Sequence, residues 1–352
     1  MVHFHLEKFN YKLIFAVVGG SLAGCRRLKG WTAGKLAIRT GGGSFVSKSS
    51  FVKLLRSVKR GTLKLIETFL DKAEDQPQIG KQFVPPMMAH ILRDYVRNVP
   101  YVRESKVLSL FATIINKYKS VMIEDVPRIF EAIFQCTLEM ITKIFEDYPK
   151  HRLKFFSLLR DIAAHCFSAL IRLLSQQLNL VMDSIIWGFW HTEKNIAKTG
   201  LNLLLEMLKN FQASEFCNQF YRTYFLTIEQ EIFAVLMDTF HKPGFKLHVL
   251  VLQHLFCLVE SGALMEPLWY ASTVHYPYPN NAVFVREYTI KLLGTSFPNM
   301  TVAEIGILQE QTFTACLNVE KTYQLELDKA IRHHQPNSKH SPNYALMSFD
   351  KV

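Results

Sequence analysis

The chain has 352 residues, of which 49% are hydrophobic, and it carries a formal net charge of +11. This apolar content is ample for a folded core, yet no apolar run reaches the roughly 18 residues of a membrane span, so we expect no membrane insertion. Residues 1–40 hold seven Lys or Arg against one Glu, whereas residues 41–304 hold 29 basic against 24 acidic residues. The folded part is therefore close to balanced, and we expect no nucleic-acid partner.

The first 44 residues are predicted to be a basic, glycine-rich and mostly disordered leader. An apolar run at 13–18 leaves three interpretations open: a signal-peptide core, a mitochondrial-type presequence or an unfolded leader. Arg26 and Arg27 follow the run where a signal cleavage site should be small and neutral, so we favour the unfolded leader. The segment around Ser21 differs from a nucleophile elbow because Ala23 replaces the second Gly, and no α/β pattern surrounds it.

Residues 50–72 form the first predicted helix. Gly61 lies in its middle and costs about 1 kcal/mol relative to Ala. One face is expected to be apolar, through Val52, Leu55, Val58, Leu63, Ile66 and Phe69. The other face is basic, through Lys53, Arg56, Lys59, Arg60 and Lys64. Such a basic run either grips an acidic partner or is a solvated face, and the solvated face is the more common case.

Residues 123–147 and 150–174 show the pattern of the whole chain most clearly. Both segments repeat apolar residues at three- and four-residue steps, and Tyr148-Pro149 separates them. A hairpin with such wide apolar stripes buries them only against similar hairpins on either side, so we predict an all-α fold of the α-solenoid type. The other predicted helices are 87–97, 104–119, 176–191, 193–211, 214–241, 243–261 and 282–296.

Two aromatic segments interrupt this regularity. Residues 187–191 read Trp-Gly-Phe-Trp-His, which either clamps a ligand or, as we favour, fills a core or a seam between repeats. The loop 265–281 interleaves Trp269, Tyr270, Tyr276 and Tyr278 with prolines. It is either a docking element or, as we favour, a strap packed on the last helices.

No catalytic, cofactor-binding or metal-binding residue is indicated. The polar residues are spread along helix faces instead of converging on a pocket, so we expect no enzyme. The histidines do not combine with Cys or carboxylates at metal-ligand spacing. The six cysteines lie far apart and are expected to be small buried hydrophobes of a reducing compartment: Cys25, Cys136, Cys166, Cys217, Cys257 and Cys316.

The residues from about 51 to 304 resemble the C-terminal repeats of the exportin-1 family, nuclear export receptors of the importin-β superfamily, and are nearest to the plant form. Motifs that carry the resemblance are Ser57-Val58-Lys59-Arg60, Phe83-Val84-Pro85-Pro86, Arg97-Asn98-Val99-Pro100, Asn116-Lys117, Tyr148-Pro149 with His151-Arg152, and Asp183-Ser184-Ile185-Ile186-Trp187. Three positions depart from the family, in which Glu is usual at Gly61, an acidic residue at Lys150 and a basic residue at Trp190.

The resemblance implies HEAT-type antiparallel helix pairs over residues 45–304, followed by a diverged, mostly disordered tail over 305–352 with one helix at 318–331. It also implies Ran GTPase and nuclear pore proteins as partners, and shuttling between nucleus and cytoplasm. In the family, the export signal of the cargo lies in repeats upstream of the matching stretch, so we expect a truncated fragment without the cargo groove. The alternative is a non-transporting HEAT-repeat interaction or regulatory fragment.

Overall fold

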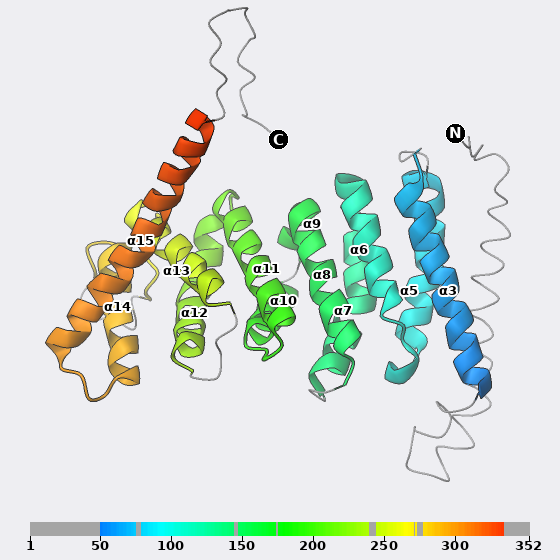
Figure 1. The fold of residues 1–352 in the computed structure, drawn as a ribbon, viewed down its shortest axis with the longest axis horizontal. Helices are drawn as coiled ribbons and strands as arrows, with labels where there is room; N and C mark the ends of the chain where they lie inside the picture. Colours follow the sequence, from blue (N-terminus) through cyan, green and yellow to red (C-terminus); the bar gives the residue numbers. More distant parts are fainter. Residues whose placement is uncertain are drawn as a thin grey trace, which may run out of the picture. The chain divides into compact units, whose positions relative to one another are not determined.

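The computed structural model describes residues 50–74, 79–143, 147–173, 175–238, 244–270, 272 and 277–333, with the side chains of 50–52, 55 and 319–333 left aside. Helices make up the regular structure of these ranges, and no strand occurs in them (Figure 1). The predicted all-α class is thus confirmed for this part of the chain. The leader predicted over residues 1–44 and the tail from residue 334 onward lie outside the described residues.

The chain forms two compact units, Met1–Val251 and Leu252–Val352. The α-helices of the first unit are α3 (Ser50–Lys72), α5 (Val84–Arg97), α6 (Lys106–Tyr118), α7 (Val126–Lys143), α8 (Pro149–His165), α9 (Phe167–Ile171), α10 (Ser175–Phe189), α11 (Lys194–Gln212) and α12 (Cys217–Met237). Short helical turns lie at Ile79–Phe83, Pro100–Val102 and Lys119–Met122. The boundary between the units falls within α13 (Phe245–Glu260), and the second unit holds α14 (Asn281–Ser296) and α15 (Val302–His333).

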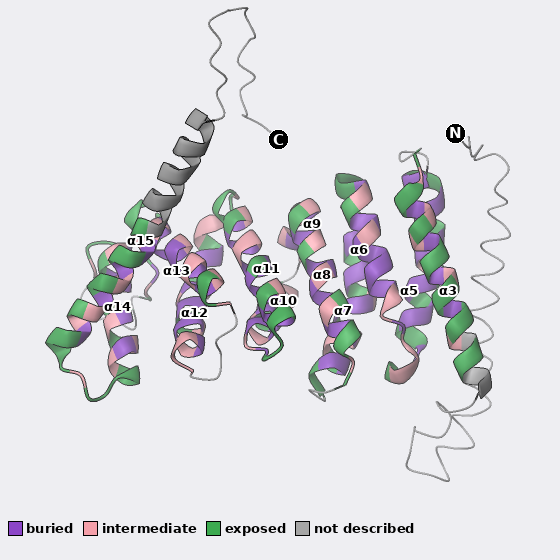
Figure 2. Cartoon of the chain, viewed as in Figure 1, coloured by how far each residue is buried: buried purple, intermediate pink, exposed green. Residues whose placement is uncertain are grey.

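The first unit is built from two layers of helices. In one layer α3 packs on α6, α6 on α8 and α8 on α11, while α5 packs on α7 in the other (Figure 1). This is the predicted α-solenoid of antiparallel helix pairs. Figure 2 shows buried positions along the sides where neighbouring helices meet, most densely on α6, whose apolar residues from Val107 to Ile115 are nearly all buried. The wide apolar stripes seen in the sequence therefore become contacts between repeats.

The first helix buries the predicted face at Leu63 and Ile66 but differs from the prediction one turn earlier, at Val58 and Lys59. Val58, expected to point inward, is 47% exposed, whereas Lys59, expected on the solvated face, is only 1% exposed. The buried stripe follows Lys59, Leu63, Ile66 and Leu70 at steps of four, three and four residues. The prediction was wrong at these two positions because a basic residue was assigned to solvent by type, although Lys59 continues the apolar stripe one turn before Leu63.

Two helix boundaries also differ from the predicted ones. Pro85-Pro86 stands in the first turn of α5 and starts that helix. The N–H groups of a first helical turn have no acceptor within the helix, so the missing N–H of proline costs no hydrogen bond there. The segment predicted as one helix over 150–174 is divided at Cys166, whose backbone leaves the helical region at φ −133°. The Cys166 thiol donates to the Lys119 carbonyl oxygen at 3.2 Å, so the break ties α8 to the turn that follows α6.

The prediction of a mostly disordered tail from residue 305 does not hold at 305–317, which belong to α15, whereas the helix predicted at 318–331 is the later part of the same helix. The helix begins with a capping box, because the Glu304 carboxylate accepts from the Thr301 N–H at 2.8 Å and the Thr301 hydroxyl oxygen accepts from the Glu304 N–H at 3.3 Å. Residues at four- and three-residue steps are buried within the second unit: Ile305, Gln309, Phe313 and Cys316.

The loop 265–281 is a strap in its described part, as favoured from the sequence. Trp269 and Tyr278 both pack on Phe284 of α14, with ring centroids 5.5 and 5.1 Å away. The buried side chain of Asn281 holds the loop, accepting from the Leu268 N–H at 2.9 Å and donating to the Leu264 carbonyl oxygen at 3.1 Å. The aromatic residues therefore close the core of the second unit. Among the described helices, none has the length and apolar character needed to cross a membrane.

Candidate functional site

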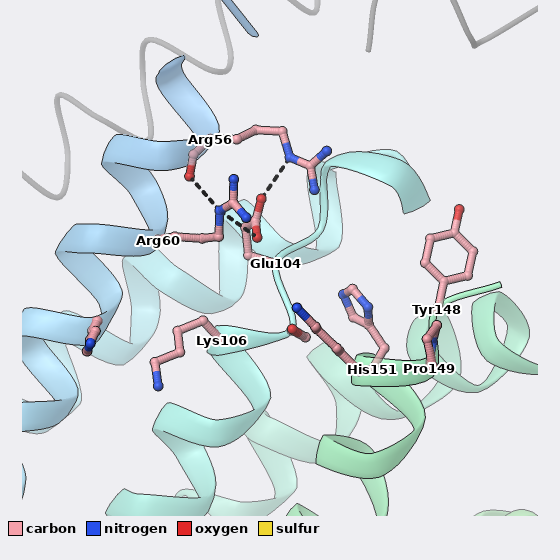
Figure 3. Close-up of a pocket in the computed structure, with 10 residues that line it drawn as sticks. Arg56, Arg60, Glu104, Lys106, Tyr148, Pro149 and His151 are labelled. Carbon is pink, nitrogen blue, oxygen red and sulfur yellow. Dashed lines mark hydrogen bonds and ion pairs between the residues drawn. The ribbon is translucent and has the colours of Figure 1, made fainter. Parts of the chain in front are cut away.

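A pocket of about 500 Å³ opens where α3, α6 and α8 meet in the first unit (Figure 3). We call it the basic pocket, because five of the residues that line it are basic and one is acidic. Its lining residues are Arg56, Arg60, Lys64, Glu104, Ser105, Lys106, Tyr148, Pro149, Lys150 and His151. Three segments that are far apart in the sequence thus contribute to one concave surface.

Two arginines of α3 converge on one buried carboxylate. Arg56 and Arg60 lie one helical turn apart, and Figure 3 shows both reaching Glu104, which stands just before α6. The Arg56 Nε donates to Glu104 Oε1 at 2.8 Å, and the Arg60 Nε lies 3.6 Å from Glu104 Oε2. Because Glu104 contacts each guanidinium at Nε, it holds both groups in place, and no described residue accepts a hydrogen bond from their terminal nitrogens.

A second ion pair lies beneath the pocket and joins α3 to α5. Lys59 is bonded to Asp94, and both side chains are about 1% exposed. The Asn98 amide also donates to Asp94 Oδ2, at 2.9 Å. A buried charge is tolerated only when it is paired and hydrogen-bonded, so this contact fixes the rotation of α3 about its axis. That rotation is what brings Arg56, Arg60 and Lys64 to the pocket.

The wall formed by α8 is held by the backbone and side chain of Arg103. The Arg103 guanidinium donates to the carbonyl oxygens of Cys136 at 2.7 Å and Tyr95 at 3.2 Å, while the Arg103 carbonyl oxygen lies 3.1 Å from His151 Nε2. Burial lowers the pKa of His151 to about 4, assisted by the positive charges of Arg56 and Arg103. The imidazole is therefore neutral near pH 7 and donates to the carbonyl through Nε2.

Tyr148 stands at the rim in a left-handed conformation, with φ 60°. This conformation is unfavourable for a tyrosine. It turns the chain into Pro149, which begins α8, and the Tyr148 ring meets the His151 ring edge-on at 5.6 Å. Burial and the Asp147 charge raise the pKa of the Tyr148 phenol, so the hydroxyl remains protonated and able to donate a hydrogen bond at neutral pH.

The charges of the pocket are only partly compensated. Lys106 forms an ion pair with Glu67, and Glu104 forms ion pairs with Arg56 and Arg60. Lys64 and Lys150 have no acidic partner in the part of the chain that the structure describes. The result is a concave surface with a net positive charge, suited to holding an anion.

The structure divides the basic run predicted on the first helix into three kinds of position. Lys59 is buried in an ion pair, Lys53 is exposed, and the remaining three residues line the basic pocket. Sequence reasoning did not identify Glu104, Lys106 and Tyr148 as pocket residues, because their place in the pocket depends on packing between distant segments; Glu104, for example, lies 48 residues from Arg56. The Ser105–Lys106 helix start was the one local signal available.

The aromatic cluster at 187–191 fills a seam, as favoured from the sequence. Phe189 and His191 are buried, and Trp187 stacks on Phe156 of α8 with ring centroids 6.1 Å apart. The Trp190 indole donates to Glu231 of α12 at 2.7 Å. In the described ranges no group of three His, Cys, Asp or Glu residues is placed to hold a metal ion. Burial raises the pKa of the Cys166 thiol to about 11, which keeps it unreactive.

Comparison with known proteins identifies the family. Residues 36–332 match the family model described as CRM1 C terminal. The chain belongs to the exportin-1 C-terminal family. It is 80% identical over 266 residues to Protein EXPORTIN 1A of Arabidopsis thaliana, which covers 76% of this chain and 25% of that relative. Exportin-1 of Schizosaccharomyces pombe is 40% identical over 266 residues, covering 75% of the chain and 24% of the relative.

The match to the exportin-1 family is longer than the sequence motifs indicated. We expected it to span about 51–304, whereas the family model extends from residue 36 to residue 332 and so includes α15. Exportin-1 of Drosophila melanogaster aligns over 277 residues at 38% identity, covering 78% of this chain. The chain spans about a quarter of the length of these curated relatives.

Proposed function

We propose that this chain acts as a HEAT-repeat scaffold of the nuclear export receptor type, a binding protein with no catalytic residues. The observation that carries the proposal is the 80% identity to Protein EXPORTIN 1A over 266 residues. That identity supports the same fold and the same packing between repeats, from which we infer that the helix surfaces of the relative are largely present in this chain. The layered packing of α3, α6, α8 and α11 supplies a rigid surface of this kind.

The partners proposed for this chain are Ran GTPase and nuclear pore proteins, contacted along the seams between repeats. The corresponding location is the nucleus and cytoplasm, with passage through the pore. We further propose that this stretch does not hold an export signal by itself, because the family resemblance places the signal-binding groove in repeats upstream of the matching residues. With about a quarter of the receptor represented, Ran contacts are expected to be weak.

A second candidate is a non-transporting interaction or regulatory fragment of the same fold. The three departures from the family, at Gly61, Lys150 and Trp190, support this alternative. Such a fragment binds a partner through one helix surface without distinguishing the nucleotide state of Ran. Discrimination between nucleotide states therefore separates the two candidates.

For the domain organisation, we propose a leader over residues 1–44, a repeat region from residue 45 through α15, and a tail from residue 334. The packing of α15 on α14 supports placing residues 305–333 with the repeats instead of with the tail.

The experiment is biolayer interferometry with the full chain immobilised and Ran offered in its GTP-bound or GDP-bound form. The receptor-type scaffold predicts weak, saturable binding of Ran-GTP and much weaker binding of Ran-GDP. Equal binding of both forms, or binding of neither, contradicts the receptor-type scaffold and favours the non-transporting fragment.

A further inference from the structure

We propose that the basic pocket between α3, α6 and α8 binds a short peptide segment rich in Asp or Glu. The site belongs wholly to the first unit, and it stands apart from the recognition of Ran or of an export signal proposed above. Its occupant is a flexible acidic segment of a partner protein. The following observations carry this inference.

The pocket contains positively charged side chains that no described carboxylate neutralises. Lys64 and Lys150 lack an acidic partner in the described part of the chain, and they face the same cavity as Arg56 and Arg60. Like charges that share one concave surface repel each other, and a ligand with several carboxylates relieves that repulsion. A single exposed lysine does not indicate a ligand, whereas five basic residues around one cavity indicate a negatively charged ligand.

The two arginines are already oriented for carboxylates. Glu104 accepts a hydrogen bond from the Arg56 Nε at 2.8 Å and lies near the Arg60 Nε. The Arg60 Nε also donates to the Arg56 carbonyl oxygen at 3.3 Å. No described residue bonds the terminal nitrogens of either guanidinium. These nitrogens form the planar edge that pairs with a carboxylate through two parallel hydrogen bonds. Glu104 thus reduces the entropy that a ligand must overcome to order both side chains.

The surrounding backbone adds to the attraction. Both α6 and α8 begin at the pocket, at Lys106 and Pro149, so the positive ends of two helix dipoles face it (Figure 3). The Ser105 hydroxyl makes no capping hydrogen bond, which leaves it available to a ligand. Tyr148 contributes a protonated hydroxyl and an aromatic face at the rim. Positive charge, hydrogen-bond donors and the Tyr148 ring together suit the pocket to a peptide.

The size of the pocket favours a peptide over a nucleic acid. A cavity of about 500 Å³ accommodates a few residues. Duplex or single-stranded nucleic acid instead requires basic groups distributed along a path that follows successive phosphates. Along α3 that path is interrupted, because Lys59 points into the core and Val58 and Leu65 are exposed. The buried Glu104 would also repel a phosphate backbone more than it repels a flexible chain that can avoid it.

The test is fluorescence anisotropy with the full chain and a fluorescein-labelled peptide of alternating glutamate and serine. The double variant Lys64→Gln/Lys150→Gln removes the two uncompensated charges from exposed positions and should weaken binding about tenfold. The variant Lys64→Arg/Lys150→Arg should bind like the native chain. The matched control is Lys194→Gln/Lys198→Gln on α11, which removes two exposed charges elsewhere in the same unit and should change the affinity less than about twofold.

Three results would overturn the proposal. The first is an absence of saturable binding to the glutamate peptide. The second is an equal loss of affinity in the pocket variant and the α11 control, which would indicate a non-specific charge effect. The third is tighter binding of oligothymidylate than of the peptide, lost in the pocket variant, which would make the pocket a nucleic-acid site. The basic leader is common to all variants, so any contribution from it appears equally in each.

Discussion

The buried ion pair between Lys59 and Asp94 gives the sharpest test of how the first repeats are held together. Replacing Lys59 with Met removes the ammonium group but keeps most of the apolar stem. Asp94 then remains about 1% exposed, with the Asn98 amide as its remaining hydrogen-bond donor among the described side chains, because Asp94 Oδ1 has no partner in the described residues. An uncompensated buried charge of this kind costs about 3 to 5 kcal/mol.

The expected loss of unfolding free energy is large compared with the total stability of a domain. Domains are stable by about 5 to 15 kcal/mol, so Lys59→Met removes a large part of the stability of the first unit. With a urea m-value of about 2.5 to 3 kcal/mol/M, the midpoint of unfolding should fall by about 1 to 2 M. The matched control is Lys53→Met on the exposed face of the same helix, which should change the stability by less than about 0.5 kcal/mol.

The double variant Lys59→Met/Asp94→Leu separates charge from packing. Replacing both partners with apolar groups of similar size removes the stranded charge, and the remaining cost is the unpaired Asn98 amide, about 1 to 2 kcal/mol. Urea unfolding followed by circular dichroism measures all variants, and hydrogen exchange in α3 and α5 shows whether the loss is local. If Lys59→Met is no more harmful than Lys53→Met, or if the double variant is as unstable as the single one, the reasoning is refuted.

Further predictions concern backbone, pH and surface. Gly61→Ala should stabilise the chain by about 0.5 to 1 kcal/mol, because nothing lies within 4 Å of the added methyl group, and an unmoved urea midpoint would argue against a helical Gly61. Gly188→Ala should destabilise it by about 1 to 3 kcal/mol in the same assay, since the methyl group would lie 2.7 Å from the Phe156 ring. Burial lowers the pKa of His151 from 6.5 to about 4, so the unfolded chain binds a proton that the folded chain excludes. Stability should therefore be complete above about pH 6.5 and fall toward pH 4, less steeply in His151→Gln, and an unchanged pH profile would contradict this. We expect the chain to self-associate through α3, because Leu54 and Leu65 are each more than 60% exposed on one face of that helix. Leu54→Gln/Leu65→Gln should therefore reduce self-association in sedimentation velocity, and an unchanged sedimentation profile would exclude that face.

The sequence was sufficient to predict the helical architecture because the apolar period is regular and the connections are short. The helix α7 lies within the segment predicted for it, and α8 begins one residue before its predicted segment, at Pro149, where the sequence indicated a stop and a restart. The aromatic cluster around Trp187 was also assigned to a seam correctly. These features depend on residues close together in the chain, which periodicity captures.

The basic pocket could not be predicted, because it depends on contacts between distant segments. Lys59 is buried through a partner 35 residues away on another layer of helices, and although its position continues the apolar stripe of α3, its residue type indicated a solvated side chain. Glu104 is likewise 48 residues from Arg56. The helix α15 is a different case, since the capping box at Thr301 and Glu304 was readable in the sequence and was overlooked.

The central claim is that this chain is a scaffold segment of an exportin-type receptor that does not hold an export signal by itself. The most direct measurement is fluorescence anisotropy of a labelled leucine-rich export-signal peptide, titrated with the full chain in the presence and absence of Ran-GTP. We predict no saturable binding at low micromolar protein under either condition. Saturable binding that Ran-GTP strengthens, and that is lost when the hydrophobic residues of the peptide are replaced with Ala, would contradict the claim.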